Sequence, residues 1–292
     1  MKLTSGFPRR FSFVLILVCG NWLLAAEPEA VLRARAESGD VDAQFNLAVV
    51  LHARAGANDA IEWFLTAADQ GHAVAQANLG VIYAQGLGVP RNDGQAVSWF
   101  RKAAEHGNAD AMFNLGVKLM DGAGVTSDPG AAVKWFQKGA ELGHARAQDN
   151  LGWAYADGIG VAMSAPDAVK WFRKAAEQGL ANAQVNLGVC YATGYGLAKN
   201  EAEAMKWYRK AAEQGSTRAQ YSLGAMLANG DGVPRNYVEA YKWMNLAAAK
   251  GDEGAVRARS DLEQRMTRAQ IAEGQHLSTA AKVTKETKRE GS

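Results

Sequence analysis

Residues 75–83 read AQANLGVIY and residues 99–107 read WFRKAAEHG, and these two stretches decide the fold because both recur in register along the chain. A Leu-Gly pair returns with a period of 36 residues, at Leu79-Gly80, Leu115-Gly116, Leu151-Gly152, Leu187-Gly188 and Leu223-Gly224. A tryptophan returns with the same period, at Trp99, Trp135, Trp171, Trp207 and Trp243. Self-similarity of this kind is typical of solenoids of helical hairpins. We therefore predict an all-α fold, a right-handed α/α solenoid of helix-turn-helix repeats.

Each repeat predicts two helices. In the first helix Ala75, Leu79 and Tyr83 fall at helical spacing on one face. A glycine pair such as Gly86 and Gly88 follows, and glycine permits the positive φ of a tight reversal. The second helix is expected to begin at a capping side chain, supplied in successive repeats by Asn92, Asp128, Ser164, Asn200 and Asn236. It then carries a large tryptophan ring, which we expect to be the constant ring of the core, and two alanines, and it ends at a glycine.

The pattern A-x-A-Q-x-N-L-G-x-x-Y, then G-x-G-V, then A-x-x-W-F-x-K-A-A-E-x-G, resembles the Sel-one-like repeat, a relative of the tetratricopeptide repeat. The resemblance covers five repeats from Gly71 to Gly251, and a shorter copy precedes them. It implies a tetratricopeptide-like superhelix. We expect a solenoid over residues 27–275, with an N-terminal cap helix at 29–39, six repeats at about 40–251 and C-terminal cap helices at 253–275. Residues 276–292 are polar and lysine-rich, and we expect a disordered tail there.

The first 26 residues have the layout of a secretory signal peptide. Lys2, Arg9 and Arg10 precede an apolar stretch at 11–24, and Ala25-Ala26 forms a small-residue cleavage site. We expect cleavage after Ala26, although an uncleaved anchor is an alternative. The mature protein would then be exported, periplasmic or secreted, without a stable membrane span.

Charge and cysteine content exclude several function classes. Removing the three basic residues of the signal from the 32 in the chain leaves 29 against 30 acidic residues, so the mature chain offers no electrostatic case for nucleic acid. Cys190 is the one cysteine outside the signal, and we expect a buried, inert thiol. The five histidines do not cluster with other ligands, and no nucleophile motif is present. We therefore expect no cofactor, no metal and no catalysis.

The first-helix stripe, defined as positions 77, 81, 84 and 85 of the second hairpin and their equivalents, is expected to line the concave groove of a tetratricopeptide-like stack. Its residues vary between repeats, so it is where a partner could be encoded. The candidate partner-binding residues are Phe45, Phe113, Val117, Asp149, Trp153, Asp157 and Tyr221. Two interpretations of the four rings stay open: they pack between adjacent first helices as extra core, or they anchor a partner.

The leading functional hypothesis is a non-catalytic scaffold or adaptor of the cell envelope, binding one or more proteins along the groove. The resemblance implies an alternative, because disulfide-rich exported members of the family include β-lactam-binding or β-lactam-hydrolysing proteins. The absence of paired cysteines here argues against it. A third hypothesis is a regulator whose stability is controlled by proteolysis at a cap or the tail.

Overall fold

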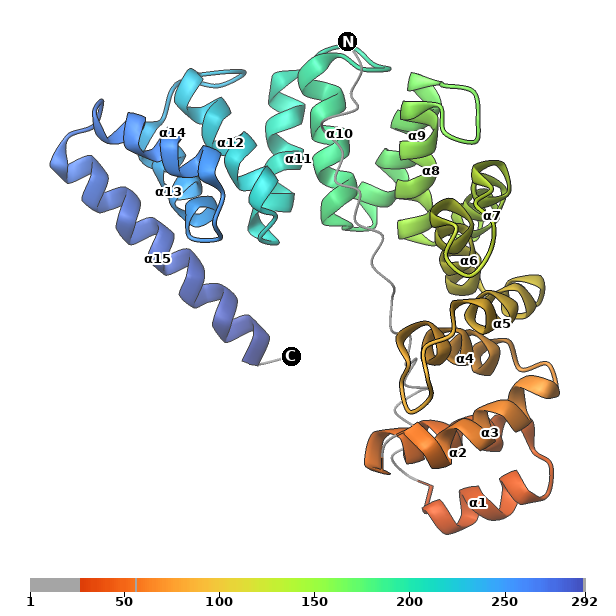
Figure 1. The fold of residues 1–292 in the computed structure, drawn as a ribbon. Helices are drawn as coiled ribbons and strands as arrows, with labels where there is room; N and C mark the ends of the chain where they lie inside the picture. The colour runs from red at the N-terminus through yellow and green to blue at the C-terminus, as the bar shows by residue number, and fades with distance from the viewer. Residues whose placement is uncertain (1–26, 56, 291–292) are drawn as a thin grey trace. The chain divides into compact units, whose positions relative to one another are not determined.

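The computed structural model describes residues 27–55 and 57–290, which form fifteen α-helices and no strand within those ranges (Figure 1). The prediction of an all-α helical repeat fold is confirmed. The predicted signal peptide lies outside the described residues. The chain divides after Met163 into two compact units, which are described separately.

The first unit holds one cap helix and seven repeat helices. Their bounds are α1 (Glu29–Glu37), α2 (Val41–Ala55), α3 (Ala57–Asp69), α4 (Ala73–Gln85), α5 (Asp93–Glu105), α6 (Ala109–Asp121), α7 (Pro129–Glu141) and α8 (Ala145–Asp157). Within this unit, α2 packs on α3, α4 on α5 and α6 on α7. The apolar core at the start of the unit lies among α1 to α4 and includes Leu32, Leu47 and Phe64.

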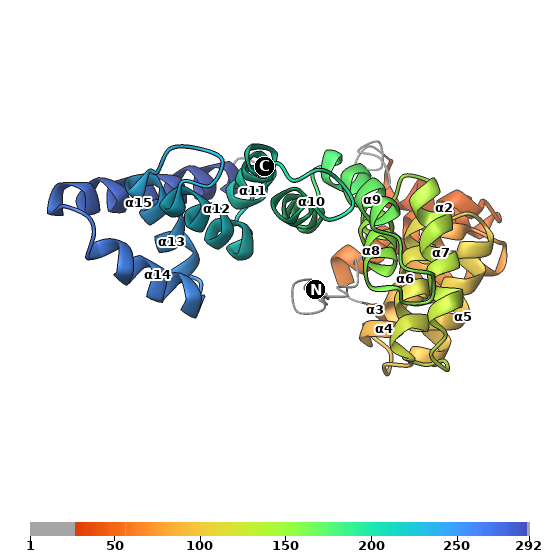
Figure 2. The same cartoon turned by 90° about the horizontal axis from the view of Figure 1, so that it is seen from above.

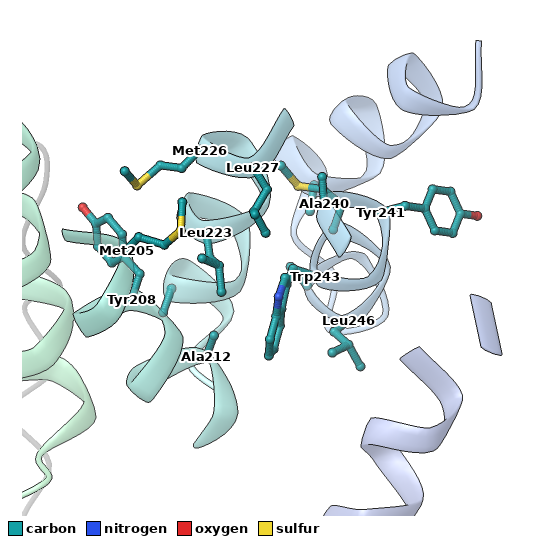
Figure 3. Packing of buried hydrophobic residues seen from close by; sticks show 14 of the residues in the cluster. Met205, Tyr208, Ala212, Leu223, Met226, Leu227, Ala240, Tyr241, Trp243 and Leu246 are labelled. Atoms are coloured by element: carbon teal, nitrogen blue, oxygen red, sulfur yellow. The ribbon is translucent and has the colours of Figure 1, made fainter. Parts of the chain in front are cut away.

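The second unit continues the pattern and ends in two further helices. Its helices are α9 (Ala165–Glu177), α10 (Ala181–Thr193), α11 (Glu201–Glu213), α12 (Thr217–Asn229), α13 (Tyr237–Ala248), α14 (Glu253–Glu263) and α15 (Arg268–Glu290). Its core brings Leu223 and Leu227 of α12 against Trp243 of α13. Tyr241 leaves α13 on the side opposite Leu223 (Figure 3).

The predicted capping residues are confirmed at the start of the second helices. Asn92, Asp128, Ser164, Asn200 and Asn236 each accept a hydrogen bond from the backbone N–H three residues on. Such a cap satisfies a donor that the helix itself leaves unpaired.

In the hairpins α4–α5 and α6–α7, the glycine of the Leu-Gly pair lets the two helices touch. A Cβ atom added to Gly80 would lie 2.4 Å from Cδ1 of Phe100, and one on Gly116 would lie 2.5 Å from Cε1 of Phe136. The ring that fills the hairpin core is therefore the one after the tryptophan. Phe100 and Phe136 are fully buried, whereas Trp99 and Trp135 are only partly buried. The expectation that the tryptophan is the constant core ring is wrong for these repeats.

Two structural features require glycine at the second position of the loop pair: a positive φ and a close approach to neighbouring backbone. Gly124 has a φ of +77°, and a Cβ atom there would lie 2.2 Å from the carbonyl carbon of Asp93. Gly160 has a φ of +70° and would meet the carbonyl oxygen of Pro129 at 2.2 Å. The loop thus docks on the start of the preceding second helix, an approach that only glycine allows.

In five of the six repeats, a buried glutamine ties the first helix to the helix before it. Nε2 of Gln76 donates to the carbonyl oxygen of Ala68 at 2.8 Å, and its Oε1 contacts Nδ1 of His106 at 2.9 Å. Equivalent bonds to a carbonyl eight residues earlier are made by Gln44, Gln148, Gln184 and Gln220. We call this set the glutamine ladder.

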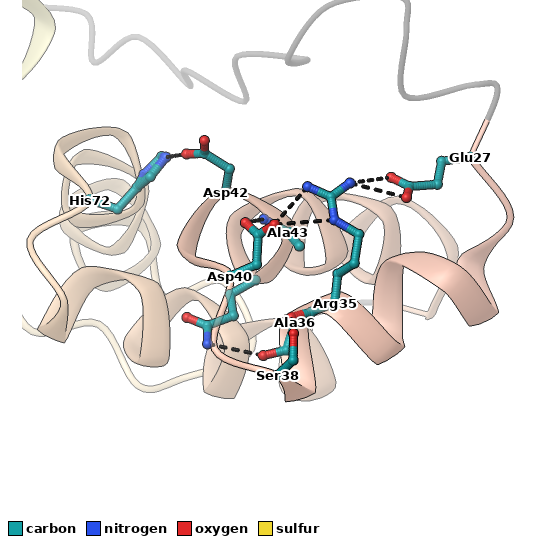
Figure 4. A network of polar contacts seen from close by, with 9 residues as sticks. Glu27, Arg35, Ala36, Ser38, Asp40, Asp42, Ala43 and His72 are labelled. Atoms are coloured by element: carbon teal, nitrogen blue, oxygen red, sulfur yellow. Dashed lines mark hydrogen bonds and ion pairs between the residues drawn. The ribbon is translucent and has the colours of Figure 1, made fainter.

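The N-terminal cap helix is held by an arginine between two carboxylates. Arg35 of α1 donates to Glu27 at 3.1 Å and to Asp40 at 2.7 Å (Figure 4). Asp40 in turn accepts from the backbone N–H of Ala43, in the first turn of α2. These bonds fix α1 against the first repeat.

The C-terminal end differs from the sequence-based expectation. The predicted disordered tail at 276–292 is wrong for residues 276–290, because α15 continues to Glu290. Both views show α15 as a long helix after α14 (Figure 1 and Figure 2). It packs on α13 through Gly274 and Ser278, both buried, and Oγ of Ser278 accepts from Nδ2 of Asn245 at 2.8 Å.

Candidate partner-binding face

The first-helix stripe is closed at α2 and α6. Phe45 is 5% exposed, Phe113 is 2% exposed and Val117 is 1% exposed. The ring of Phe45 also lies 6.0 Å from that of Phe64, and the ring of Phe113 lies 6.1 Å from that of Phe136. These three candidates therefore lie in the core. For the two phenylalanines, this is the first of the two interpretations that the sequence left open. They offer no surface to a partner in this structure.

His72 covers the ring of Phe45. The two rings stack with centroids 4.6 Å apart and planes 20° apart. Nδ1 of His72 accepts the backbone N–H of Ala75 at 3.1 Å and so caps α4, while Nε2 faces Oδ1 of Asp42 at 3.5 Å (Figure 4). Burial lowers the pKa of His72 below its ordinary value, and the charge of Asp42 opposes that shift.

His144 repeats this arrangement on α8. Its ring stacks on Phe113 with centroids 5.1 Å apart and planes 29° apart. Nδ1 accepts the backbone N–H of Ala147 at 3.0 Å, and Nε2 lies 3.0 Å from Oδ1 of Asp110. The sequence placed both histidines at hairpin starts but gave no sign that they lie on the phenylalanines of the stripe.

The stripe opens at α8. Asp149, Trp153 and Asp157 are all partly exposed, and their spacing of four residues puts them on one face of the helix. Each of the three also takes part in a contact within the chain. An indole therefore lies between two carboxylates on a helix whose opposite side is fixed in the core by Leu151.

Tyr221 lies on α12 of the second unit and is 37% exposed. A Cβ atom on Gly254 would lie 3.3 Å from Cε2 of Tyr221, so the phenol ring rests on the start of α14. Tyr221 belongs to the second unit, whereas the α8 residues of the stripe belong to the first.

The second helices present a surface that sequence reasoning missed. Lysine nitrogens lie over the partly buried indoles, with Lys102 4.1 Å from the ring centroid of Trp99 and Lys138 4.3 Å from that of Trp135. A shallow depression on α7 is lined in part by Trp135 and Lys138. The recurring W-F-x-K spacing was the signal that could have indicated these cation–π pairs.

A buried ion pair was also missed. Lys118 of α6 is 1% exposed and contacts the carboxylate of Asp93, which also accepts from Nη2 of Arg91 at 2.8 Å. Burial would raise the pKa of Asp93, but the hydrogen bonds from Lys118 and Arg91 lower it overall. The equivalent positions in other repeats are apolar, including Ile82 and Met226, so a lysine there was unexpected.

A metal site and a reactive thiol each set requirements that can be compared with the described residues. Within them, no group of three or more His, Cys, Asp or Glu side chains could hold a metal ion. Cys190 is fully buried, and burial raises its pKa to about 12, which makes the thiolate scarce at neutral pH. No helix in the described part of the chain is long and apolar enough to cross a membrane.

Comparison with known families finds six consecutive matches to the Sel1 repeat. They cover residues 41–72, 73–108, 109–144, 145–180, 181–216 and 217–252. No curated protein sequence matches the chain.

Two solved structures resemble the fold closely. One is c5321, a protective antigen present in uropathogenic Escherichia coli strains, which is 36% identical with a TM-score of 0.81. That match covers 87% of this chain and 55% of the antigen, so the chain spans about half of the antigen's length. The other is a Sel1 repeat protein from Oxalobacter formigenes, 32% identical with a TM-score of 0.67, covering 77% of this chain and 93% of that one.

Proposed function

The chain belongs to the Sel1 repeat family, and from this premise we propose that it is an adaptor of the cell envelope that holds segments of partner proteins on its first-helix stripe. Sel1 repeats generally form non-catalytic scaffolds that mediate protein–protein interactions.

The observation that carries the proposal is the α8 part of the stripe. Trp153 is a large, rigid side chain that can bury much area at little entropic cost, and it is partly exposed. Asp149 and Asp157 flank it one turn away on either side. This arrangement fits a partner segment with an apolar residue next to a lysine or arginine.

The stripe is presented on a preorganised helix. The cap at His144 fixes the start of α8, and Gly158, with a φ of +68°, ends it in the left-handed conformation. Leu151 and Ala154 are fully buried beneath the exposed face. A rigid presentation lowers the cost of ordering side chains on binding.

Export is part of the proposal and is supported by the sequence of residues 1–26. Its direct test is N-terminal sequencing of the protein purified from the envelope fraction of its native cells. A mature chain that begins at Glu27 supports export with cleavage after Ala26. A chain that keeps residues 1–26 and stays in the cytosol contradicts it.

The groove part of the proposal is tested by Trp153→Ala, with Trp99→Ala as the matched control. Both substitutions remove a partly exposed indole from the first unit, but Trp99 lies on a second helix, away from the stripe. We expect Trp153→Ala to weaken capture of a crosslinked envelope partner at least tenfold, and Trp99→Ala to leave it unchanged. Equal capture by both folded variants would contradict the assignment of the stripe.

A further inference from the structure

The histidine caps occur as complete sets. In two repeats the first helix carries the sequence Asp-x-x-Phe, and a histidine caps the first helix of the next repeat. The two sets are Asp42, Phe45 and His72, and Asp110, Phe113 and His144. The other repeats have none of the three residues at these positions. The helices that follow those repeats begin after Asn108, Leu180, Ser216 and Asp252 instead of a histidine.

Both sets lie in the first unit, and both depend on an unprotonated Nδ1 atom. That nitrogen accepts the N–H of Ala75 or Ala147, so the network assigns the ring proton to Nε2, which faces the aspartate. A second proton on the ring must go to Nδ1. It would end the capping bond and place a positive charge at the positive end of the helix dipole.

Opposing forces act on the protonated ring, and the geometry at His72 decides between them. Asp42 favours the charged imidazole, but its side chain is 82% exposed, so solvent screens it. His72 itself is 17% exposed and covers an aromatic ring. Desolvation therefore outweighs the aspartate, and the folded state binds this proton less readily than the unfolded chain does.

Few other charges face these rings. Beside His72, His106 at the end of α5 lies close to Gly71, with Cε1 3.7 Å from the place of a Cβ atom there. Asp69, in the last turn of α3, is exposed. Beside His144, the last turn of α7 carries Lys138, which lies over Trp135, and Glu141, which accepts from Gln137.

On α8 itself, Arg146 follows His144 by two residues. Its positive charge lies near the same helix start. It adds nothing that would hold a second positive charge on the ring.

We propose that His72 and His144 are acid-sensitive latches: a second proton on either ring removes the cap of α4 or α8 and lifts the imidazole from Phe45 or Phe113. The latch at His72 is closed above about pH 6.5, the ordinary pKa of histidine, and opens as the pH falls below it, because burial lowers its pKa. Acid thereby uncovers the two aromatic residues of the first-helix stripe that are closed at neutral pH. This inference does not depend on the proposed partner.

The sign of the effect follows from linkage. Because the folded-state pKa of His72 is lowered, its contribution to stability is fully present above the unfolded pKa and is lost as the pH falls through the folded one. At His72, the equilibrium between closed and open cap shifts by at most about tenfold per pH unit in that window.

The test is hydrogen exchange of the full chain, followed by mass spectrometry between pH 7.5 and 5 and corrected for intrinsic exchange rates. We expect the first turns of α4 and α8 to lose protection as the pH falls. The first turn of α6 is an internal control, because Asn108 caps it through a side chain that does not titrate in this range. An equal loss of protection in α6 would overturn the proposal.

The matched variants are His72→Asn and His144→Asn. Asparagine caps α6 at the equivalent position, so these variants are expected to fold and to keep their caps without titrating. We expect the acid-dependent loss of protection, and the parallel rise in binding of an apolar fluorescent dye, to disappear in the double variant. Persistence of both acid responses in a folded double variant would contradict the latch.

Discussion

The absence of a Cβ atom on Gly116 sets the distance between the two helices of the α6–α7 hairpin. A Cβ atom on Gly116 would lie 2.5 Å and 2.7 Å from two ring carbons of Phe136, a fully buried side chain that has no room to withdraw. The glycine of the Leu-Gly pair is thus a packing residue, although glycine weakens an isolated helix.

We predict that Gly116→Ala lowers the free energy of unfolding by about 1–3 kcal/mol through overpacking. Gly130→Ala is the matched control, because Gly130 is also helical and a Cβ atom there would meet its nearest neighbour at 3.4 Å. It should be neutral or slightly stabilising. Urea denaturation of both variants checks this, and equal stabilities would refute the packing argument.

The buried thiol of Cys190 gives a second residue-scale prediction. With a pKa of about 12 and no exposed area, it should react with a thiol reagent at pH 8 only after unfolding. Stopped labelling with and without denaturant measures this. Rapid labelling of the native protein would show that the thiol is accessible after all.

The capping residues and the buried cysteine could be predicted from the sequence because each depends on local chemistry. The identity of the core ring could not. Trp99 and Phe100 are adjacent aromatic residues, and only the contact between Phe100 and Gly80 shows which ring fills the core of the hairpin.

At the scale of elements, the glutamine ladder is interrupted in one repeat, where both the glutamine and the polar side chain that contacts it are replaced by apolar residues. Met112 occupies the glutamine position in the third repeat. In the same repeat, Leu142 occupies the position from which a polar side chain contacts the ladder glutamine in other repeats, as Gln70, His106 and Gln214 do. Both partners are apolar in the same repeat. The junction between helices therefore tolerates either a complete polar pair or none.

We predict that Gln76→Ala lowers the free energy of unfolding by about 1–3 kcal/mol, because the buried carbonyl of Ala68 loses its donor. The control is Gln137→Ala, which removes an exposed bond to Glu141 and should change stability by less than about 0.5 kcal/mol. Thermal and urea unfolding measure both. A negligible effect at Gln76 would remove the ladder from the account of stability.

The last helix shows why the C-terminal end could not be predicted. The residues of α15 that lie against α13 include Ile271, Gly274, Ser278 and Ala281. Their spacing is helical, but two of the four are not hydrophobic, so a search for apolar periodicity finds little. The close approach of Gly274 to Tyr241 replaces hydrophobic bulk.

We predict that Gly274→Val detaches α15, because even a Cβ atom there would lie 2.8 Å from Cδ1 of Tyr241. Ala272→Val is the control, since Ala272 is exposed on the same helix. Limited proteolysis should cut α15 faster in the first variant alone. Equal cleavage of both variants would contradict the packing of α15 on α13.

At the scale of the whole molecule, the repeat family and the all-α architecture followed from the period of the sequence. The candidate site followed only in part. Membership of the first-helix stripe does not show which of its rings is exposed, because the stripe includes both Phe113 and Trp153. Burial separates them: His144 covers Phe113, which is 2% exposed, whereas Trp153 is partly exposed.

The charges at the α8 stripe lead to a prediction for binding. Asp149→Asn combined with Asp157→Asn should weaken partner capture and reduce its dependence on salt, because both carboxylates are proposed to face a basic residue. Capture measured at low and high ionic strength checks this. Unchanged affinity and salt dependence would exclude a role for these charges.

The most direct test of the account is site-specific photocrosslinking. A photoreactive amino acid replaces Trp153 in one full-length variant and Trp99 in another, and each is irradiated with envelope extract of the native cells. The account predicts a discrete protein adduct from position 153 and none from position 99. Adducts from position 99 alone, or the same adducts from both, would contradict the assignment of the first-helix stripe as the partner-binding face.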